Sequence, residues 1–206
     1  MIPAMYIPDA FREENPAVLH EIMRRYSFAT LISGSAASLQ ASHLPFLFDA
    51  ERNVLRCHMA RANRQWNGFQ DGGEVMVLFQ GPHAYISPTW YETQLAVPTW
   101  NYVTVHAYGQ ARVVDETALR AIVDDTVRLH EADRENPWPM PLPEEYLAKL
   151  LRGIVGFEIS ITRLEGKLKL SQNRSAADVR GVIDGLIAGE FGGEHEVAEW
   201  MKRVSV

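Results

Sequence analysis

Cysteine is nearly absent from this sequence, because Cys57 is the single one among 206 residues. A lone thiol excludes an internal disulfide and is typical of a reducing compartment. Long apolar runs are also missing, and the stretch 75–79 is far too short to cross a bilayer. The N-terminus lacks the basic and apolar regions of a secretory signal. We therefore expect a cytoplasmic protein without a membrane segment.

Positive charge is scarce as well. The chain has 20 Lys and Arg against 26 Asp and Glu, which gives a formal net charge of −6. Such a balance does not attract nucleic acid over the whole surface, and no helix-turn-helix with a basic second helix is evident. One local basic patch remains, formed by Arg163, Lys167, Lys169, Arg174 and Arg180. DNA is thus a possible partner that neither the charge nor a motif supports.

Several familiar catalytic and metal motifs are missing. The sequence contains no Gly-x-Gly-x-x-Gly, Walker loop or Gly-x-Ser-x-Gly, which disfavours dehydrogenases, NTPases and α/β-hydrolases. Four histidines, His43, His58, His83 and His106, lie on predicted strands without metal-ligand spacing. We expect them to be satisfied core or barrel side chains and expect no metal site. No catalytic acid or base stands out.

Short β-strand patterns separated by tight turns dominate the chain. Tight turns favour antiparallel pairing, because parallel strands need long crossovers. We predict strands over residues 28–33, 39–48, 54–58, 74–80, 83–87, 99–108, 110–114 and 156–170. A hairpin turn is expected at 34–37, and breaks in the sheet are expected at Gly81-Pro82 and Gly109.

Helix signals flank the predicted strands. Helices are predicted to start at Asn15-Pro16, Asp115 and Ser175. One more helix is predicted near 144–152, after a proline-rich connector at 136–143. The pattern predicts an α+β fold whose antiparallel sheet closes into a small β-barrel with peripheral helices. We expect a single domain over 1–206, with a helical C-terminal extension over about 175–206.

Residues 166–174 are the most informative polar segment. On a strand, Lys167, Lys169 and Ser171 would share one face, while Leu168 and Leu170 would share the other. Cations beside hydroxyl and amide groups suit a phosphate of about two negative charges. A solvated sheet edge protected by lysines explains the same pattern equally well.

A second polar segment, 58–66, lies where a strand leads into a short helix. Free backbone N–H groups at such a place can receive an anion, and Arg61, Asn63 and Gln65 could join them. The alternative is a polar loop with a helix cap at Asn63, which these residues taken alone favour.

Aromatic residues crowd the segment 85–102, namely Tyr85, Trp90, Tyr91, Trp100 and Tyr102. Such rings can stack on a planar heterocycle. Clustered aromatic residues more often form core or interface, and we expect the same here.

Together these segments resemble one family closely. The matching blocks are 5–8 (Met-Tyr-Ile-Pro) with Phe11, 41–46 (Ala-Ser-His-Leu-Pro-Phe), 60–63 (Ala-Arg-Ala-Asn), 81–88 (Gly-Pro-His-Ala-Tyr-Ile-Ser-Pro), 97–102 (Val-Pro-Thr-Trp-Asn-Tyr) and 169–174 (Lys-Leu-Ser-Gln-Asn-Arg). They are similar to the PaiB-type "FMN-binding negative transcriptional regulator" family, in order from about Met5 to Leu186.

The resemblance implies the flavin split-barrel fold shared with pyridoxamine 5′-phosphate oxidases, with FMN bound between the subunits of a homodimer. It places Ser42, His43 and Leu44 along the isoalloxazine ring and Trp100 and Asn101 on the strand that faces the ring. It assigns the phosphate to Arg61, Ala62, Asn63, Gln65 and Trp66, and the family's C-terminal motif to Lys167, Lys169, Ser171 and Gln172. The family often has Pro at the position of Arg64 and Lys at that of Gln94.

The resemblance leaves the activity open. The chain could be a flavin-dependent oxidoreductase or a flavin-linked negative regulator of transcription. The alternatives are a DNA-binding repressor without enzymatic activity and a barrel that binds haem.

Overall fold

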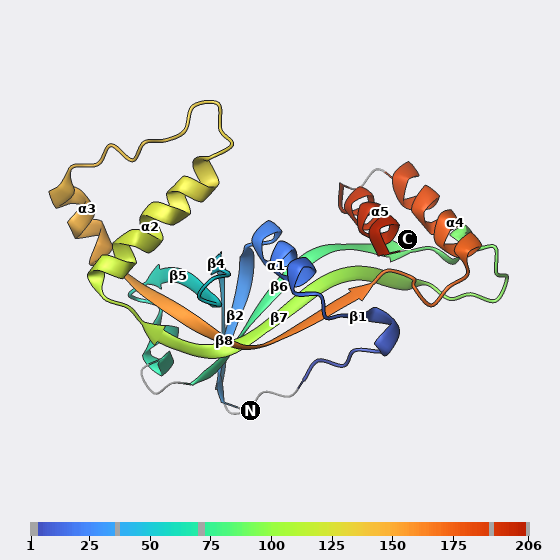
Figure 1. The fold of residues 1–206 in the computed structure, drawn as a ribbon, viewed down its shortest axis with the longest axis horizontal. Helices are drawn as coiled ribbons and strands as arrows, with labels where there is room; N and C mark the ends of the chain where they lie inside the picture. Colours follow the sequence, from blue (N-terminus) through green and yellow to red (C-terminus); the bar gives the residue numbers. More distant parts are fainter. Residues whose placement is uncertain (1–3, 36–37, 70–72, 190–191, 205–206) are drawn as a thin grey trace. The chain divides into compact units, whose positions relative to one another are not determined.

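The computed structural model describes residues 4–35, 38–69, 73–189 and 192–204. Its strands are β1 (Arg12–Glu13), β2 (Phe28–Ser35), β3 (Ser38–Pro45), β4 (Leu47–Asp49), β5 (Val54–Ala60), β6 (Glu74–Ile86), β7 (Thr99–Val113) and β8 (Ile154–Lys169). The helices are α1 (Pro16–Arg25), α2 (Glu116–Glu131), α3 (Glu144–Leu151), α4 (Ala176–Ala188) and α5 (Gly192–Val204), with short 3-10 helices at Asp9–Phe11, Arg64–Phe69 and Pro88–Trp90 (Figure 1).

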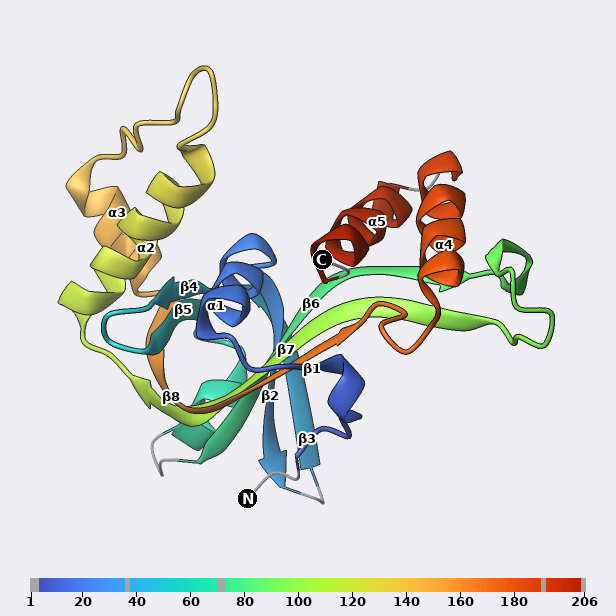
Figure 2. The ribbon, with the colours of Figure 1, turned by 45° about the vertical axis from the view of Figure 1, so that its right-hand side comes forward.

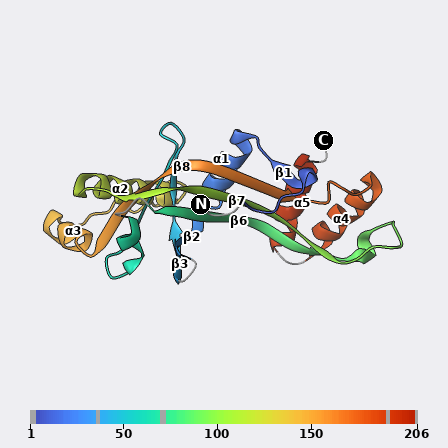
Figure 3. The same cartoon turned by 90° about the horizontal axis from the view of Figure 1, so that it is seen from below.

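The strands form one sheet in the order β3-β2-β6-β7-β8-β5-β4, with β1 paired to β8. Every pair whose register is known is antiparallel: β1 with β8, β2 with β3 and β6, and β5 with β4 and β8. Figure 3 shows the three long strands β6, β7 and β8 running side by side. The predicted α+β class with an antiparallel sheet is confirmed.

The residues group into two compact units. The first contains Met23–Phe79 and His106–Leu164, and the second contains Ala4–Ile22, Gln80–Val105 and Glu165–Val206. β6, β7 and β8 contribute residues to both. The single-domain expectation stays a prediction.

The first unit has an apolar core between strands. Phe46 packs edge-on against Phe79 and Phe157, each with ring centroids 6.2 Å away, and Phe69 lies 5.1 Å from Phe157. Leu31 and Leu55 of the same unit are fully buried as well. The alternation of β5 places Leu55, Cys57 and Met59 in this core.

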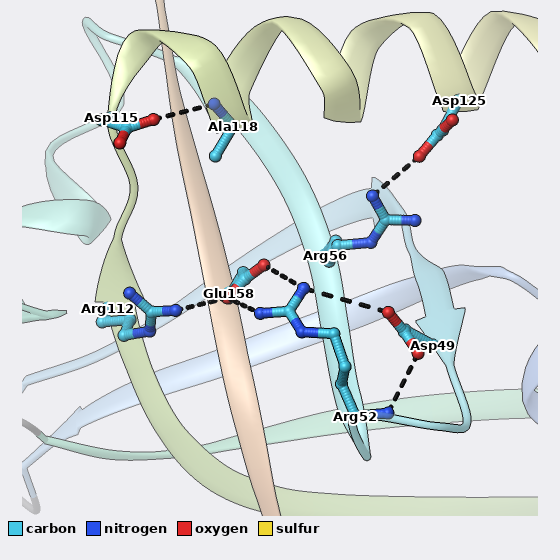
Figure 4. A network of polar contacts seen from close by, with 8 residues as sticks. All are labelled: Asp49, Arg52, Arg56, Arg112, Asp115, Ala118, Asp125 and Glu158. Atoms are coloured by element: carbon cyan, nitrogen blue, oxygen red, sulfur yellow. Dashed lines mark hydrogen bonds and ion pairs between the residues drawn. The ribbon is translucent and has the colours of Figure 1, made fainter.

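The outer face of the same strands carries a charged network (Figure 4). The Glu158 carboxylate is 4% exposed and accepts hydrogen bonds from Arg52 (2.9 Å to each oxygen) and from Arg112 (2.7 Å). Arg56, paired in register with Glu158, donates to Asp125 of α2 at 2.8 Å. These ion pairs satisfy the buried carboxylate and tie α2 to the sheet.

In the second unit, α4 and α5 cover the segments of β6 and β7 that belong to it (Figure 2). Trp200 and Met201 of α5 are at most 1% exposed, and Val182 and Leu186 of α4 are fully buried. The apolar positions of the two helices therefore face this unit's strands and each other.

The predicted helix starts are confirmed. Asp115 accepts a hydrogen bond from the Ala118 N–H at 2.8 Å, and Ser175 accepts one from the Asp178 N–H at 3.1 Å. α1 begins at Pro16, with the Asn15 side chain accepting from the Ala17 N–H. The C-terminal extension is a pair of helices.

Three strand predictions are wrong. β6 runs unbroken through Gly81-Pro82. These residues lie beyond Met76–Leu78, the segment of β6 that pairs with β2 in the described residues, and proline is tolerated at a strand edge that has no partner. β7 runs unbroken through Gly109, where a Cβ would lie 2.3 Å from the Ser160 carbonyl oxygen. The predicted strand 39–48 breaks at Phe46, whose N–H bonds the Ser27 carbonyl. The hairpin of β2 and β3 is confirmed, while residues 36–37 of its turn lie outside the described residues.

Candidate functional site

In the first unit, a polar group joins β3 to the 3-10 helix that follows β5. Asn63 Nδ2 donates to Ser42 Oγ at 2.8 Å, and Asn63 Oδ1 accepts from the Gln65 N–H at 3.0 Å. Asn63 therefore caps the 3-10 helix, as the loop interpretation predicts, and also binds the strand that contains Ser42. Ser42 and Asn63 are partly exposed and could still meet a ligand.

Gln65 lies deeper in this group and is 3% exposed. Its Nε2 donates to Ser33 Oγ at 3.0 Å and lies 3.3 Å from the carbonyl oxygens of Leu31 and Gln40. Its buried Oε1 accepts no hydrogen bond within the part of the chain that the structure describes. A buried acceptor without a donor costs stability, so this oxygen favours a ligand that supplies an N–H or O–H.

Arg61 and Trp66 flank this group. Arg61 is exposed; its Nε donates to the Arg152 carbonyl at 2.8 Å and its Nη2 to the Ile154 carbonyl at 2.9 Å. Trp66 Nε1 donates to the Arg61 carbonyl at 3.0 Å, which fixes the turn that contains Ala62. Both carbonyl bonds fix the guanidinium in place, and within the described residues Nη1 has no hydrogen-bond partner, so it can bind an anion.

His43 is not part of this polar group. It follows Ser42 on β3, so its exposed side chain points to the opposite face, where Nδ1 lies 2.9 Å from Thr30 Oγ1. Leu44 returns to the face of Ser42 and is partly buried. The structure therefore brings Ser42, Asn63 and Gln65 together and leaves His43 apart.

In the second unit, the candidate lysines at the end of β8 bind neighbouring backbone. Lys167 Nζ donates to the Tyr6 carbonyl at 3.0 Å and lies 5.4 Å and 5.5 Å from the ring centroids of Tyr6 and Tyr102. Lys169 Nζ donates to Thr99 Oγ1 and, at 2.8 Å, to the Trp100 carbonyl. The predicted alternation holds for Leu168 and Leu170, which are at most 2% exposed.

Ser171 lies just beyond β8 with a positive φ of 66°, so it does not continue the strand. Its Oγ accepts from Asn101 Nδ2 at 3.0 Å, and both side chains are buried. Gln172 accepts from the Leu170 N–H at 2.7 Å and donates to the Leu168 carbonyl. The motif thus forms a rigid turn.

The aromatic cluster is only partly core. Trp100 is 53% exposed and Tyr85 45% exposed, with their ring centroids 6.1 Å apart, whereas Tyr91 is 9% exposed. Trp100 and Tyr85 are therefore not part of the core of this chain, and a place in an interface stays a prediction for them. Exposed rings on β6 and β7 of this unit present a surface on which a planar group or a partner could pack.

The histidine prediction is also only partly right. His43 and His83 are exposed, while His58 and His106 are partly buried. Burial lowers the pKa of His58. Within the described residues no group of His, Cys, Asp and Glu is arranged to hold a metal ion.

The sequence patterns missed two groups of residues. The Arg52–Glu158–Arg112 network was not expected, and neither was the contact between Arg174 and Tyr91, whose ring centroid lies 4.7 Å from the guanidinium carbon. Arg174 belongs to the C-terminal motif and Tyr91 to the aromatic cluster, so each carried a signal, but their proximity did not. A pocket of about 520 Å³ between α2 and the following connector, lined in part by Val127 and Trp138, contains none of the candidate residues.

Solved structures share this fold. The FAD and heme binding protein from Mycobacterium smegmatis has a TM-score of 0.63 at 13% identity, over 82% of this chain and 78% of that chain. The flavocytochrome Anf3 from Azotobacter vinelandii has a TM-score of 0.62 at 13% identity, over 77% of this chain and 69% of that chain. Identity this low concerns the fold alone. The chain is an α+β split-barrel protein.

Sequence comparison gives the family. The model of the family described as "Putative FMN-binding domain" matches residues 5–163. The "Protease synthase and sporulation protein PAI 2" of Bacillus subtilis is 36% identical over 202 residues, 96% of this chain and 97% of that protein. An uncharacterized protein of Emericella nidulans is 32% identical, over 88% of this chain and 90% of the relative. The chain belongs to this FMN-binding family, and the PaiB-type resemblance is confirmed.

FMN is the cofactor that follows from the family, and the residues present fit it. The donor set of the first unit includes a guanidinium, an amide and a hydroxyl, which suits a phosphate. The unpaired buried Oε1 of Gln65 suits a polar group of a ligand.

Among the described residues, no helix is long and apolar enough to span a membrane.

Proposed function

We propose that this protein is an FMN-dependent oxidoreductase that works as a cytoplasmic homodimer. The observation that supports it most is the polar group of Ser42, Asn63 and Gln65, which includes a buried acceptor without a donor among the described residues. Bound FMN would supply the electron-transfer chemistry, while the protein would supply binding and orientation.

The proposal gives each candidate residue a role. Arg61 and Asn63 bind the phosphate group, and Ala62 and Trp66 shape the turn around them. The buried Oε1 of Gln65 accepts from an N–H or O–H of the cofactor outside its phosphate. In the first unit, Ser42 and Leu44 of β3 meet the ring, and His43 lies on the opposite face of the strand beside Thr30. In the second unit, Trp100 and Asn101 of β7 are proposed as cofactor contacts. Lys167, Lys169, Ser171 and Gln172 form a second group of cofactor contacts.

A homodimer is supported by exposed apolar side chains on the first unit. Phe28 of β2 is 70% exposed and Leu39 of β3 is 72% exposed. β3 ends the order of the sheet, so one of its edges has no partner strand among the described residues. Exposed apolar side chains beside an open edge favour association with a second chain.

A flavin-linked negative regulator of transcription is the second candidate, supported by the family's PaiB-type members. Direct DNA reading has little support in the C-terminal helices, because α5 contains Glu194, Glu196 and Glu199 against Lys202 and Arg203. A recognition helix needs a basic face. Regulation through the flavin's redox state would need no such helix.

The visible absorption spectrum of the freshly purified chain tests the proposal. We expect flavin bands, which a reductant bleaches and air restores over repeated cycles in the presence of an electron acceptor. A Soret band would show that the protein binds haem instead of flavin. A protein that stays colourless after FMN is added would contradict the proposal. A bound flavin that does not pass electrons to the acceptor in repeated cycles would favour the role of a transcriptional regulator.

A further inference from the structure

Arg174 is a half-buried cation that forms no ion pair with any of the residues that the structure describes. Its guanidinium has five N–H donors, yet within the described residues its side-chain contact is with the face of the Tyr91 ring, 4.7 Å from the centroid. A guanidinium with free donors stacked on an aromatic ring is held in place and remains able to bind an anion.

Tyr91 supplies a second unused donor at the same place. The residue is 9% exposed, and its buried hydroxyl makes no hydrogen bond with the part of the chain that the structure describes. Leaving a buried hydroxyl unpaired is costly, so native structures rarely do so without a reason. A ligand that accepts a hydrogen bond would remove this cost.

Lys169 lies close enough to Arg174 to be affected by its charge. Burial lowers the pKa of Lys169, and the neighbouring charges of Lys167 and Arg174 lower it further. Two of its three N–H groups donate to Thr99 and to the Trp100 carbonyl, which leaves one free. No carboxylate pairs with any of these three cations among the described residues.

Asp178, the acidic residue in the first turn of α4, binds other groups. Asp178, 2% exposed, accepts hydrogen bonds from the N–H groups of Glu92 (2.9 Å) and Thr93 (3.1 Å) and from the Thr93 hydroxyl (2.8 Å). These bonds tie the segment after Tyr91 to the first turn of α4, which follows Arg174. Asp178 therefore positions Tyr91 beside Arg174 without cancelling its charge.

The surrounding backbone holds the arrangement rigidly. Gly181 and Gly185 of α4 let Trp90 approach closely, because a Cβ there would lie 2.1 Å from the Trp90 carbonyl and 2.4 Å from its ring. The turn from β8 to α4, visible in Figure 2, is closed by the Arg174 N–H bond to the Ser171 carbonyl at 3.0 Å. Both partners of the contact are thus fixed.

We propose that Arg174, Tyr91 and the free N–H of Lys169 form a binding site for a phosphate group in the second unit. Two cations and a phenol hydroxyl suit a compact dianion better than a carboxylate, which needs fewer donors. The phosphate belongs either to FMN or to a phosphorylated second substrate. The site shares Lys169 with the second group of cofactor contacts, so it deepens the proposed function and rests on it in part.

The test is to titrate inorganic phosphate at constant ionic strength into the full chain, with and without saturating FMN, by calorimetry. We expect binding that Arg174→Gln weakens by about tenfold or more, because a charge-assisted contact is lost. The control Arg180→Gln removes an exposed charge of α4 and should change the affinity by less than about twofold. Equal effects of the two variants would contradict the site.

Tyr91→Phe separates a binding role from a structural one. Removing an unpaired buried hydroxyl should leave the unfolding midpoint unchanged or raise it, while phosphate affinity falls by about three- to tenfold. A variant that loses stability and binds phosphate normally would overturn the role of Tyr91.

The FMN arm identifies the source of the phosphate. If saturating FMN excludes inorganic phosphate, the site holds the FMN phosphate; if both bind together, it holds that of a second substrate. Absence of phosphate binding by the unmodified chain, together with equal FMN affinity for Arg174→Gln, would refute the site while leaving FMN binding intact.

Discussion

Arg52 binds Glu158 through two parallel hydrogen bonds of 2.9 Å, one to each carboxylate oxygen. The residues are 106 positions apart in the chain, and Glu158 is 4% exposed. The bond from Arg52 lowers the pKa of Glu158 most, and the bond and charge of Arg112 lower it further. This pair therefore joins the turn before β5 to β8 (Figure 4).

Glu158→Gln should destabilise the fold. The substitution removes a charge from a carboxylate that binds two arginines, and we expect a loss of about 1–3 kcal/mol at neutral pH. The half-exposed Arg52 keeps the loss moderate, because water can solvate it. Urea unfolding measures the effect. Glu144→Gln is the matched control, since that exposed carboxylate meets Arg120 on the surface and should change stability by less than about 0.5 kcal/mol.

The stability lost in Glu158→Gln should depend on pH. Because the pKa of Glu158 is lowered by folding, its contribution is complete above the unfolded pKa of about 4.3 and is lost as the pH falls through the lower folded pKa. The stability difference between the unmodified chain and Glu158→Gln should be constant from about pH 6 to 8 and shrink below about pH 4. A difference that grows in acid would contradict the assignment.

Gly109→Ala should destabilise the first unit by about 1–3 kcal/mol, because its Cβ would lie 2.3 Å from the Ser160 carbonyl and 2.7 Å from Ile159 Cγ2. Gly68→Ala is the control, since a Cβ there meets nothing within 4 Å. Unfolding midpoints in urea compare the two. Similar midpoints would mean that β7 and β8 do not approach each other as described.

How much of this could be predicted from the sequence depends on whether the determinant is local. The Asp115 and Ser175 caps, the buried Leu168 and Leu170, and the Asn63 cap were predictable, because each depends on residues nearby in the chain. The breaks predicted at Gly81-Pro82 and Gly109 were wrong, because the sequence does not show where a sheet edge is open or where another strand's carbonyl approaches.

The candidate site shows the same limit. The motifs containing Asn63, Gln65 and Lys169 were visible, but the contact of Gln65 with Ser33 and Gln40 depends on how β2 and β3 pair. The bonds of Asp178 to residues 92 and 93 hold Tyr91 beside Arg174. No spacing in the sequence predicts this contact.

A homodimer predicts a mass of twice the 23.3 kDa chain. Light scattering coupled to gel filtration at micromolar concentration measures it. Replacing the exposed Leu39 by Lys should shift the mass toward one chain without unfolding the protein, because the side chain is 72% exposed. A monomer that still binds FMN tightly would refute a cofactor site shared between subunits.

DNA binding should be weak and should vanish as salt rises. With a net charge of −6, the chain can neutralise only a few phosphates through its local basic patch. Fluorescence anisotropy with a labelled duplex at 50 and 200 mM salt measures the dependence. Sequence-specific nanomolar binding at physiological salt would instead establish a direct repressor.

The central claim is that the chain binds FMN through its phosphate, and a paired titration of FMN and riboflavin tests it most directly. The two ligands share the ring and differ in the phosphate, so charge-assisted contacts should make FMN bind at least about tenfold more tightly. Arg61→Gln should narrow this difference by weakening FMN alone. Equal affinities for FMN and riboflavin in the unmodified chain would contradict the account.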